Sequence, residues 1–253
     1  MEEENGSRRK FITYGLVGIG AALVLDGCGK GPAAIANNAP AEKKPDGDKK
    51  IPDAKEVTAV EDLMREHGIL RRALLVYSET ALRLRKNAAD VSPDALQKTA
   101  KLFRTFGEDY HEKKLEEAYI FPKIKQNGSG EAATYPDILT AQHDRGREIT
   151  EYIISVTNAA KLGANAAAFA DTLEGFVRMY QHHAAREDTI VFPAWKDLIT
   201  SDEYDELNDK FEDIEHEQFG DDGFEDAVKQ IGDIETTLGL NDISKFTAPP
   251  LAK

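Results

Sequence analysis

The sequence has few of the residues on which several large protein classes depend. Its 253 residues include a single cysteine, Cys28, which excludes an internal disulfide framework and any zinc site built from several cysteines. Lys and Arg number 32 against 46 Asp and Glu, for a net charge of −14. Because phosphate recognition needs a basic patch, we expect no nucleic-acid partner. Neither a glycine-rich phosphate loop nor a Ser/His/Asp arrangement is recognisable, and strand-like Val/Ile/Thr runs are missing.

The first thirty residues resemble an export signal. Residues 7–12 (Ser-Arg-Arg-Lys-Phe-Ile) are similar to the twin-arginine motif, and an apolar run follows over 14–25. As a helix this run is about 18 Å long, too short for a bilayer core of about 30 Å but typical of a signal peptide. Residues 25–28 (Leu-Asp-Gly-Cys) then resemble a bacterial lipobox, although Asp26 departs from the usual small or apolar residue. The alternative is a plain signal peptide in which Cys28 has no role.

These features divide the chain into four predicted parts. We expect an export signal over 1–28 with a lipidated Cys28, a flexible linker over 29–56, a helical domain over 57–200, and closing helices with a tail over 201–253. The linker is composed mainly of Pro, Ala, Asn, Lys and Asp and cannot bury enough apolar surface to fold. The expected location is the periplasm or cell envelope, with membrane attachment through the lipid on Cys28.

From Val57 onward, the apolar residues recur with helical spacing. The predicted fold is all-α, an antiparallel up-down four-helix bundle with extra C-terminal helices, since short loops favour antiparallel neighbours. The four long helices are expected at about 57–88, 92–122, 136–161 and 165–193, and the closing helices at about 201–217 and 223–238. Ser92 and Ser201 are predicted N-caps, and the Phe-Pro pairs at 121–122 and 192–193 are predicted helix ends. The tail from Asp242 is expected to be irregular.

Each long predicted helix carries one histidine on its apolar stripe. These residues are His67, His111, His143 and His183. Because apolar neighbours three, four and seven residues away share their helix face, the histidines are expected to point inward. Glu187 follows His183 by one turn, and Glu112 and Glu116 lie one turn apart beside His111. Any one such histidine is more often a hydrogen-bonded core residue, but one on every helix, with carboxylates nearby, favours a site for iron, manganese or zinc.

Taken in order, these motifs resemble the hemerythrin/HHE cation-binding family over about 57–200. The matching pieces are Glu66-His67, residues 111–117, Gln142-His143-Asp144 and residues 183–188. Both 111–117 and 183–188 are followed by Phe-Pro a few residues later. The resemblance implies an up-down bundle with two non-haem iron ions joined by an oxo or hydroxo bridge. The iron ligands that it carries over are His67, His111, Glu116, His143, His183 and Glu187, with Glu112 as a further candidate.

Two positions depart from the family pattern. His111 and Glu116 are five residues apart instead of four, so a π-bulge is needed to place them on one face; otherwise Glu112 takes over the role. Arg147 stands one turn after His143, where the oxygen carriers have another histidine. A site with more carboxylate and less imidazole stabilises ferric iron, which favours redox chemistry or iron handling over reversible oxygen binding.

The expected function is that of a di-iron protein that engages oxygen, nitric oxide or peroxide, as a binding or sensing protein more than as an enzyme. One alternative is a di-iron oxidoreductase that reduces peroxide or nitric oxide with an external electron donor. Another is an iron storage or donor protein. His182 is rotated about 100° from His183, and His216 lies in the closing helices, so both are expected outside the site.

Overall fold

A computed structural model describes residues 57–158 and 162–251 of the chain. All regular structure within these residues is helical, which confirms the all-α class. The expected export signal, the lipobox at Cys28 and the linker lie outside the described residues. Among the helices that are described, none combines the length and the apolar character needed to cross a membrane.

The helices follow one another with short connections. The α-helices are α1 (Ala59–Lys86), α2 (Pro93–Leu102), α3 (Phe121–Asn127), α4 (Tyr135–Asn158), α5 (Ala166–Arg186), α6 (Phe192–Asp197), α7 (Ser201–Phe219) and α8 (Gly223–Leu238). Two segments are π-helical, η2 (Phe103–Ile120) and η5 (Glu187–Val191). Short 3₁₀ turns are η1 (Ala88–Asp90), η3 (Ala132–Thr134), η4 (Leu162–Asn165) and η6 (Ile243–Phe246). As far as residue 251, where the description ends, the tail is irregular except for one turn at η6.

Local sequence signals fix the helix starts. The Thr58 side chain accepts the N–H of Glu61, and the Glu61 carboxylate accepts the N–H of Thr58, which makes a capping box at the start of α1. Ser92 caps α2 as predicted. The prediction for Ser201 was wrong by one residue, because the Thr200 hydroxyl accepts the N–H of Glu203 and is the N-cap of α7.

The two Phe-Pro pairs do not end their helices. The chain continues as helix through Pro122 to Asn127 and through Pro193 to Asp197. In both places a π-helical segment ends and each proline lies in the first turn of a new α-helical segment. Proline has no N–H to donate, and it is tolerated at the first turn of an α-helix, where that group has no intrahelical partner.

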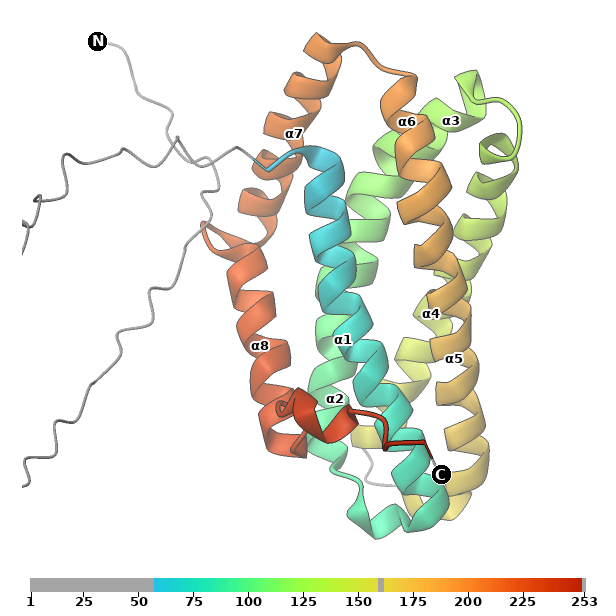
Figure 1. Cartoon of the computed structure of the whole chain (residues 1–253), viewed down its shortest axis with the longest axis vertical. Coiled ribbons are helices and arrows are strands. Elements are labelled where there is room, and N and C mark those ends of the chain that lie inside the picture. Colours follow the sequence, from blue (N-terminus) through green and yellow to red (C-terminus); the bar gives the residue numbers. More distant parts are fainter. Residues whose placement is uncertain (1–56, 159–161, 252–253) are drawn as a thin grey trace, which may run out of the picture. The chain divides into compact units, whose positions relative to one another are not determined.

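Figure 1 shows four long helical stretches side by side: α1, α2 continuing through η2 and α3, α4, and α5 continuing through η5 and α6. Helix α1 packs against α5, and α2 packs against α4. The closing helices lie along the bundle, with α8 against α1 and α2 and α7 against α1 and η2. The ring of Phe211 in α7 stacks on Trp195 in α6 at 5.9 Å between centroids, which anchors the closing helices.

An aromatic cluster fills the centre of the bundle. The Phe103 ring meets the edges of Phe176 at 5.0 Å and Tyr180 at 4.9 Å, and Tyr77 meets Phe176 at 5.4 Å. Each such pair adds about 0.5–1.5 kcal/mol beyond the burial of its apolar area. Tyr180 in turn lies 5.3 Å from the ring of His183, so the aromatic core continues directly into the polar centre.

Candidate metal centre

The four predicted histidines meet inside the bundle. His67 lies on α1, His111 on η2, His143 on α4 and His183 on α5, and each is exposed by 3% or less. The Nε2 atoms of His143 and His183 are 3.0 Å apart. Imidazole rings from four helical stretches therefore meet in the interior, in the pairs His67/His111 and His143/His183, as the apolar stripes predicted.

Two buried carboxylates lie between the histidines. Glu116 Oε1 is 3.3 Å from His111 Nε2, and its Oε2 is 3.3 Å from His143 Nε2. Glu187 Oε1 is 3.0 Å from His183 Nε2, and its Oε2 is 3.5 Å from His67 Nε2. Each carboxylate thus faces one histidine of the pair His67/His111 and one of the pair His143/His183. We call these six residues the inner cluster.

The π-helical backbone of η2 places Glu116 in the inner cluster. In a π-helix the hydrogen bond runs over five residues, as from the Phe121 N–H to the Glu116 carbonyl, so positions five apart approach the same face. His111 and Glu116 are related in this way, while Leu115, which an α-helix would put there, lies in the apolar core. The π segment is 18 residues long, much more than the one-residue bulge that the spacing required.

Glu112 lies outside the inner cluster. Its Oε1 accepts the Tyr180 hydroxyl at 2.7 Å, and its Oε2 is 3.3 Å from Arg147. It approaches His143 at Nδ1, at 4.0 Å, and not at the inward-facing Nε2. Of the two carboxylates that the sequence left open, Glu116 is the one with both oxygens facing Nε2 atoms.

In each of the four inner-cluster histidines, the ring nitrogen that points away from the centre, Nδ1, has its own hydrogen-bond partner on a neighbouring helix. The Nδ1–partner pairs are His67 with Asp188 (2.7 Å), His111 with Glu66 (2.7 Å), His143 with Glu117 (2.9 Å) and His183 with Gln142 (2.9 Å). An oxygen acceptor at Nδ1 selects the tautomer that carries its proton there and turns the Nε2 lone pair inward. These four bonds link the helical stretches in a closed circuit: α1 to η2, η2 to α4, α4 to α5, and η5, which continues α5, back to α1. We call this circuit the outer ring.

Sequence reasoning assigned no role to the four outer partners, although a signal was present. Each partner is the immediate sequence neighbour of an inner residue, in Glu66-His67, Glu116-Glu117, Gln142-His143 and Glu187-Asp188. Consecutive α-helical residues are about 100° apart around the axis, so when one faces the centre the next faces an adjacent helix. His182 and His216 are exposed and take no part, as expected.

The Phe-Pro motifs also contribute to the centre. Phe121 stacks on the His143 ring at 5.5 Å and Phe192 stacks on the His67 ring at 5.4 Å. Each phenylalanine covers an imidazole of a different helix and excludes water from that side. The two segments that end in Phe-Pro therefore each supply a carboxylate and a covering ring to the centre.

Several polar atoms of the inner cluster lack a hydrogen bond. These are His111 Nε2 and both oxygens of Glu116 and of Glu187. Burial alone would lower the pKa of His111 and raise that of Glu116, but their mutual attraction reverses both effects. The pKa of His111 is held well above its usual value and that of Glu116 well below. Buried donors and acceptors without hydrogen bonds are costly, and coordination of a cation would satisfy them.

The ligand atoms fit two overlapping metal positions. Glu116, His143, His183 and Glu187 offer atoms that all lie within 4.8 Å of one another, and His67, His111 and Glu116 form a second such group. Glu116 belongs to both groups. The mixture of imidazole nitrogen and carboxylate oxygen suits iron, manganese or zinc, whereas calcium and magnesium prefer oxygen alone.

A small cavity adjoins the inner cluster between α1 and α5. Its volume is about 10 Å³, the room that one water-sized molecule needs. The walls include His67, His111 and Glu116, with Tyr180 and Glu112 beside them. A molecule the size of one water in this cavity would touch the inner cluster directly.

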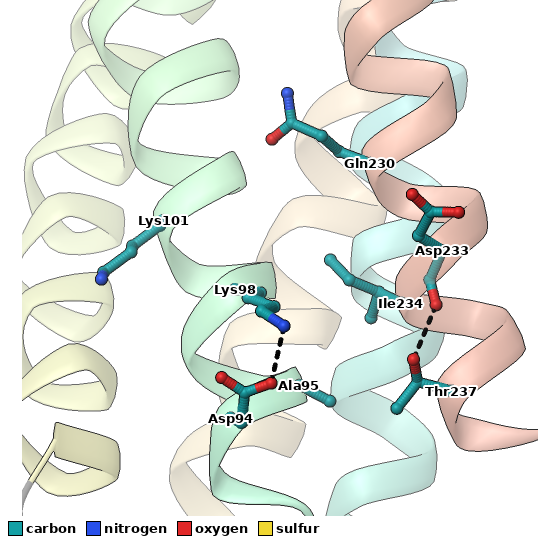
Figure 2. Close-up of a pocket in the computed structure, with 8 residues that line it drawn as sticks. All are labelled: Asp94, Ala95, Lys98, Lys101, Gln230, Asp233, Ile234 and Thr237. Atoms are coloured by element: carbon teal, nitrogen blue, oxygen red, sulfur yellow. Dashed lines mark hydrogen bonds and ion pairs between the residues drawn. The ribbon is translucent and has the colours of Figure 1, made fainter.

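A larger groove lies elsewhere, between α2 and α8, with a volume of about 370 Å³ (Figure 2). Lys98 and Asp94 form an ion pair at 2.7 Å on its α2 side, and Ile234 projects from α8 (Figure 2). Its walls contain no residue of the inner cluster or the outer ring. The size of a groove is therefore a poor guide to the chemistry of this molecule.

The helical bundle and the inner cluster define a helical protein with a cation-binding centre of histidine and glutamate. The hemerythrin HHE cation-binding domain matches residues 58–195, and the chain belongs to this family. Uncharacterised proteins of Mycobacterium tuberculosis (strain H37Rv) and Mycobacterium bovis are each 43% identical over 193 residues, which cover 76% of this chain and 74% of theirs. No solved structure matches the chain.

Proposed function

We propose that the inner cluster binds two non-haem iron ions, with Glu116 and Glu187 each shared between the two positions. The observation that carries this proposal is the set of five buried, unbonded ligand atoms on residues from facing helices. Inward-facing glutamates and histidines of a bundle core are the ligand types of carboxylate di-iron proteins. Iron bound there would supply an open coordination position and one-electron redox chemistry.

The chain prepares this centre before any ligand arrives. The outer ring holds each imidazole with Nε2 inward, so the nitrogens need not reorient. Phe121 and Phe192 cover two of the rings. The resulting low-dielectric surroundings strengthen the attraction between the carboxylates and a cation. An up-and-down arrangement of the four long stretches, proposed from the family, would bring the ligands in from alternating directions.

We further propose that the natural ligand is oxygen, nitric oxide or peroxide, and that the protein binds or senses it. The cavity beside the inner cluster supports this proposal, because its volume of about 10 Å³ admits only a very small molecule. Leu70 and Leu74 give the cavity an apolar side, which favours weakly hydrated molecules over solvent.

A second candidate is reductive chemistry, in which peroxide or nitric oxide is consumed. It is favoured by Tyr180, whose hydroxyl donates to Glu112 at 2.7 Å while both residues line the cavity. This pair places an exchangeable proton at the cavity wall. Such an enzyme would need an external electron donor, so consumption of reductant during steady addition of peroxide would distinguish it from a binding protein.

For the cellular context, we propose an exported protein of the periplasm or cell envelope, attached to the membrane by a lipid on Cys28. The support is the order of sequence features: a twin-arginine pattern, an apolar run and then the sole cysteine. Mass spectrometry of the mature protein tests this directly. A diacylated Cys28 as the first residue is expected, and an N-terminus elsewhere would exclude the anchor.

The test of the proposed function is metal content combined with an optical spectrum. The protein is purified without oxygen from iron-supplied cells, its metals are counted, and its absorption is recorded before and after air. Two irons per chain with new near-ultraviolet bands on oxidation are expected. Bleaching on degassing would indicate a carrier, an irreversible change would indicate redox chemistry, and rapid loss of iron to a chelator would indicate a donor protein. A folded protein that binds no metal would refute the assignment.

A further inference from the structure

Only one of the residues that line the cavity beside the inner cluster is exposed to solvent. Ten side chains line it, and nine of them are buried, including Leu70, Leu74 and Ala184 on its apolar side. The remaining lining residue, Arg71 on α1, is exposed by 46% along its side chain. As the exposed lining residue, Arg71 marks the solvent-facing side of the cavity, which we call its mouth.

Arg71 is held at the mouth by a carboxylate that also holds an inner histidine. Its Nη2 pairs with Asp188 Oδ2, and the other oxygen of Asp188 pairs with His67 Nδ1 at 2.7 Å. Asp188 is itself only 14% exposed. Because Asp188 holds Arg71 and His67 through different oxygens, a movement of Arg71 away from Asp188 would leave the bond between Asp188 and His67 in place.

We propose that Arg71 controls access to the cavity: it lets neutral oxygen, nitric oxide and hydrogen peroxide pass, favours small monovalent anions and repels cations. The inference rests on the proposed function, since it concerns what reaches the metal centre. A guanidinium at the mouth attracts an anion and can pair with it as it releases Asp188. It repels cations, and its side chain covers the apolar walls from water until it moves.

Arg71→Gln removes the positive charge of Arg71 but keeps a hydrogen-bonding side chain at the mouth, so it tests the role of the charge. Arg71→Ala removes the side chain that covers the mouth, so it tests the role of that cover. Arg85→Ala is the matched control: Arg85 also projects from α1, is 40% exposed and pairs with Asp171 and Glu174 of α5, but does not line the cavity. Association of azide and of nitric oxide with iron-loaded protein is followed by stopped-flow absorption. Uptake of Co(II) by metal-free protein is followed by its visible bands.

In Arg71→Gln, the ratio of the azide to the nitric oxide rate constant should fall about threefold, the contribution of one unit charge over several ångströms in a water-like dielectric. Co(II) uptake should rise about tenfold, because the divalent charge doubles that repulsion. In Arg71→Ala, nitric oxide should also associate faster than in wild type, and Arg85→Ala should match wild type in all three rates.

An unchanged azide to nitric oxide ratio and unchanged Co(II) uptake in Arg71→Gln would overturn the role of Arg71 while leaving the di-iron proposal intact. Equal changes in Arg85→Ala would overturn it as well, since they would show a general effect of surface charge. If folded wild-type protein takes up neither iron nor Co(II), both proposals fail together. Helical circular dichroism of each variant identifies a loss of fold, and Arg71→Gln alone suffices if Arg71→Ala does not fold.

Discussion

Glu108 and Glu116 lie on the same π-helical segment, and neither side chain is exposed, yet their pKa values shift in opposite directions. Burial raises the pKa of Glu108 to about 7. The same burial acts on Glu116, but His111 and His143 face its two oxygens and hold its pKa well below the usual value. Glu116 is therefore an anion at neutral pH, while Glu108 is partly protonated there.

The comparison indicates that partners, and not burial, distinguish the proposed ligand Glu116 from the carboxyl of Glu108. Glu108 accepts the Thr150 hydroxyl at 2.5 Å and lies 3.0 Å from Arg104, at the edge of the bundle. Both partners favour the ionised carboxylate and lower its pKa, but burial, together with the nearby Glu112, outweighs them. Of these two glutamates, only Glu116 has an imidazole nitrogen opposite each oxygen, where a cation would satisfy both groups.

The largest expected effect comes from removing the charge of each glutamate in turn. Glu116→Gln should lower the affinity for iron by more than about 100-fold, because the loss of a shared ligand should exceed the 10–100-fold cost of losing an outer hydrogen bond. Glu108→Gln is the matched control from the same helix and should keep two irons per chain. Competition with a coloured chelator measures both. Iron loss in Glu108→Gln, with retention in Glu116→Gln, would reverse the assignment.

Exchanging Leu115 and Glu116 tests whether the π-helical backbone decides which residue faces the centre. The double variant Leu115→Glu, Glu116→Leu should weaken iron binding as Glu116→Gln does, because it removes the same ligand and position 115 points into the apolar core. A carboxylate buried there without a partner should also lower the free energy of unfolding by about 3 kcal/mol. Iron analysis and urea denaturation provide the measurements, with Leu115→Met as the control. Normal iron binding by the exchanged protein would mean that the segment is α-helical in solution.

The raised pKa of Glu108 predicts a pH-dependent stability. The folded protein binds this proton more tightly than the unfolded chain, so the stabilisation is complete below pH 4.5 and is lost as the pH rises through about 7. The loss is about 3 kcal/mol at most, from a shift of about 2.5 pKa units. Glu108→Gln should remove this pH dependence. Measured by urea denaturation, the free energy of unfolding of the variant should therefore rise relative to that of wild type between pH 5 and pH 8. Parallel curves for the two proteins would indicate that Glu108 ionises normally.

The smallest expected effect concerns the outer ring, where one partner differs from the others. Glu117 offers a carboxylate to His143, whereas Gln142 offers a neutral amide to His183. Glu117→Gln should weaken iron binding about tenfold, because the carboxylate makes its imidazole a stronger ligand. Gln142→Glu should strengthen binding for the same reason. A weaker affinity in Gln142→Glu than in Glu117→Gln would show that size or added negative charge matters more than basicity.

Much of the fold and part of the centre could be predicted from the sequence because both depend on helical periodicity. The spacing of apolar residues gives the helices, and the same spacing places His67, His143 and His183 on inward faces. The prediction failed at Pro122 and Pro193, where a switch between two helix types lets the chain continue. A change of backbone hydrogen bonding over 18 residues leaves no mark in apolar spacing alone.

The outer ring and the mouth of the cavity could not be predicted, since both depend on how the helices are rotated against one another. Asp188 follows His183 by five residues in sequence but bonds the imidazole of His67, 121 residues away. Nothing in a single helix specifies that pairing. Nothing in the sequence distinguishes Arg71 from the other arginines, and only its position beside the cavity gives it a distinct proposed role.

The outer ring is a closed circuit of hydrogen bonds, so none of its bonds lies at an end where it could open without affecting the others. Each of the four helical stretches donates one of these bonds through its histidine and accepts another through its outer partner. Turning one stretch about its axis therefore breaks bonds to two neighbours at once. Amide hydrogens around all four histidines should accordingly exchange with a single shared opening free energy, as one cooperative unit, even though the residues come from distant parts of the chain.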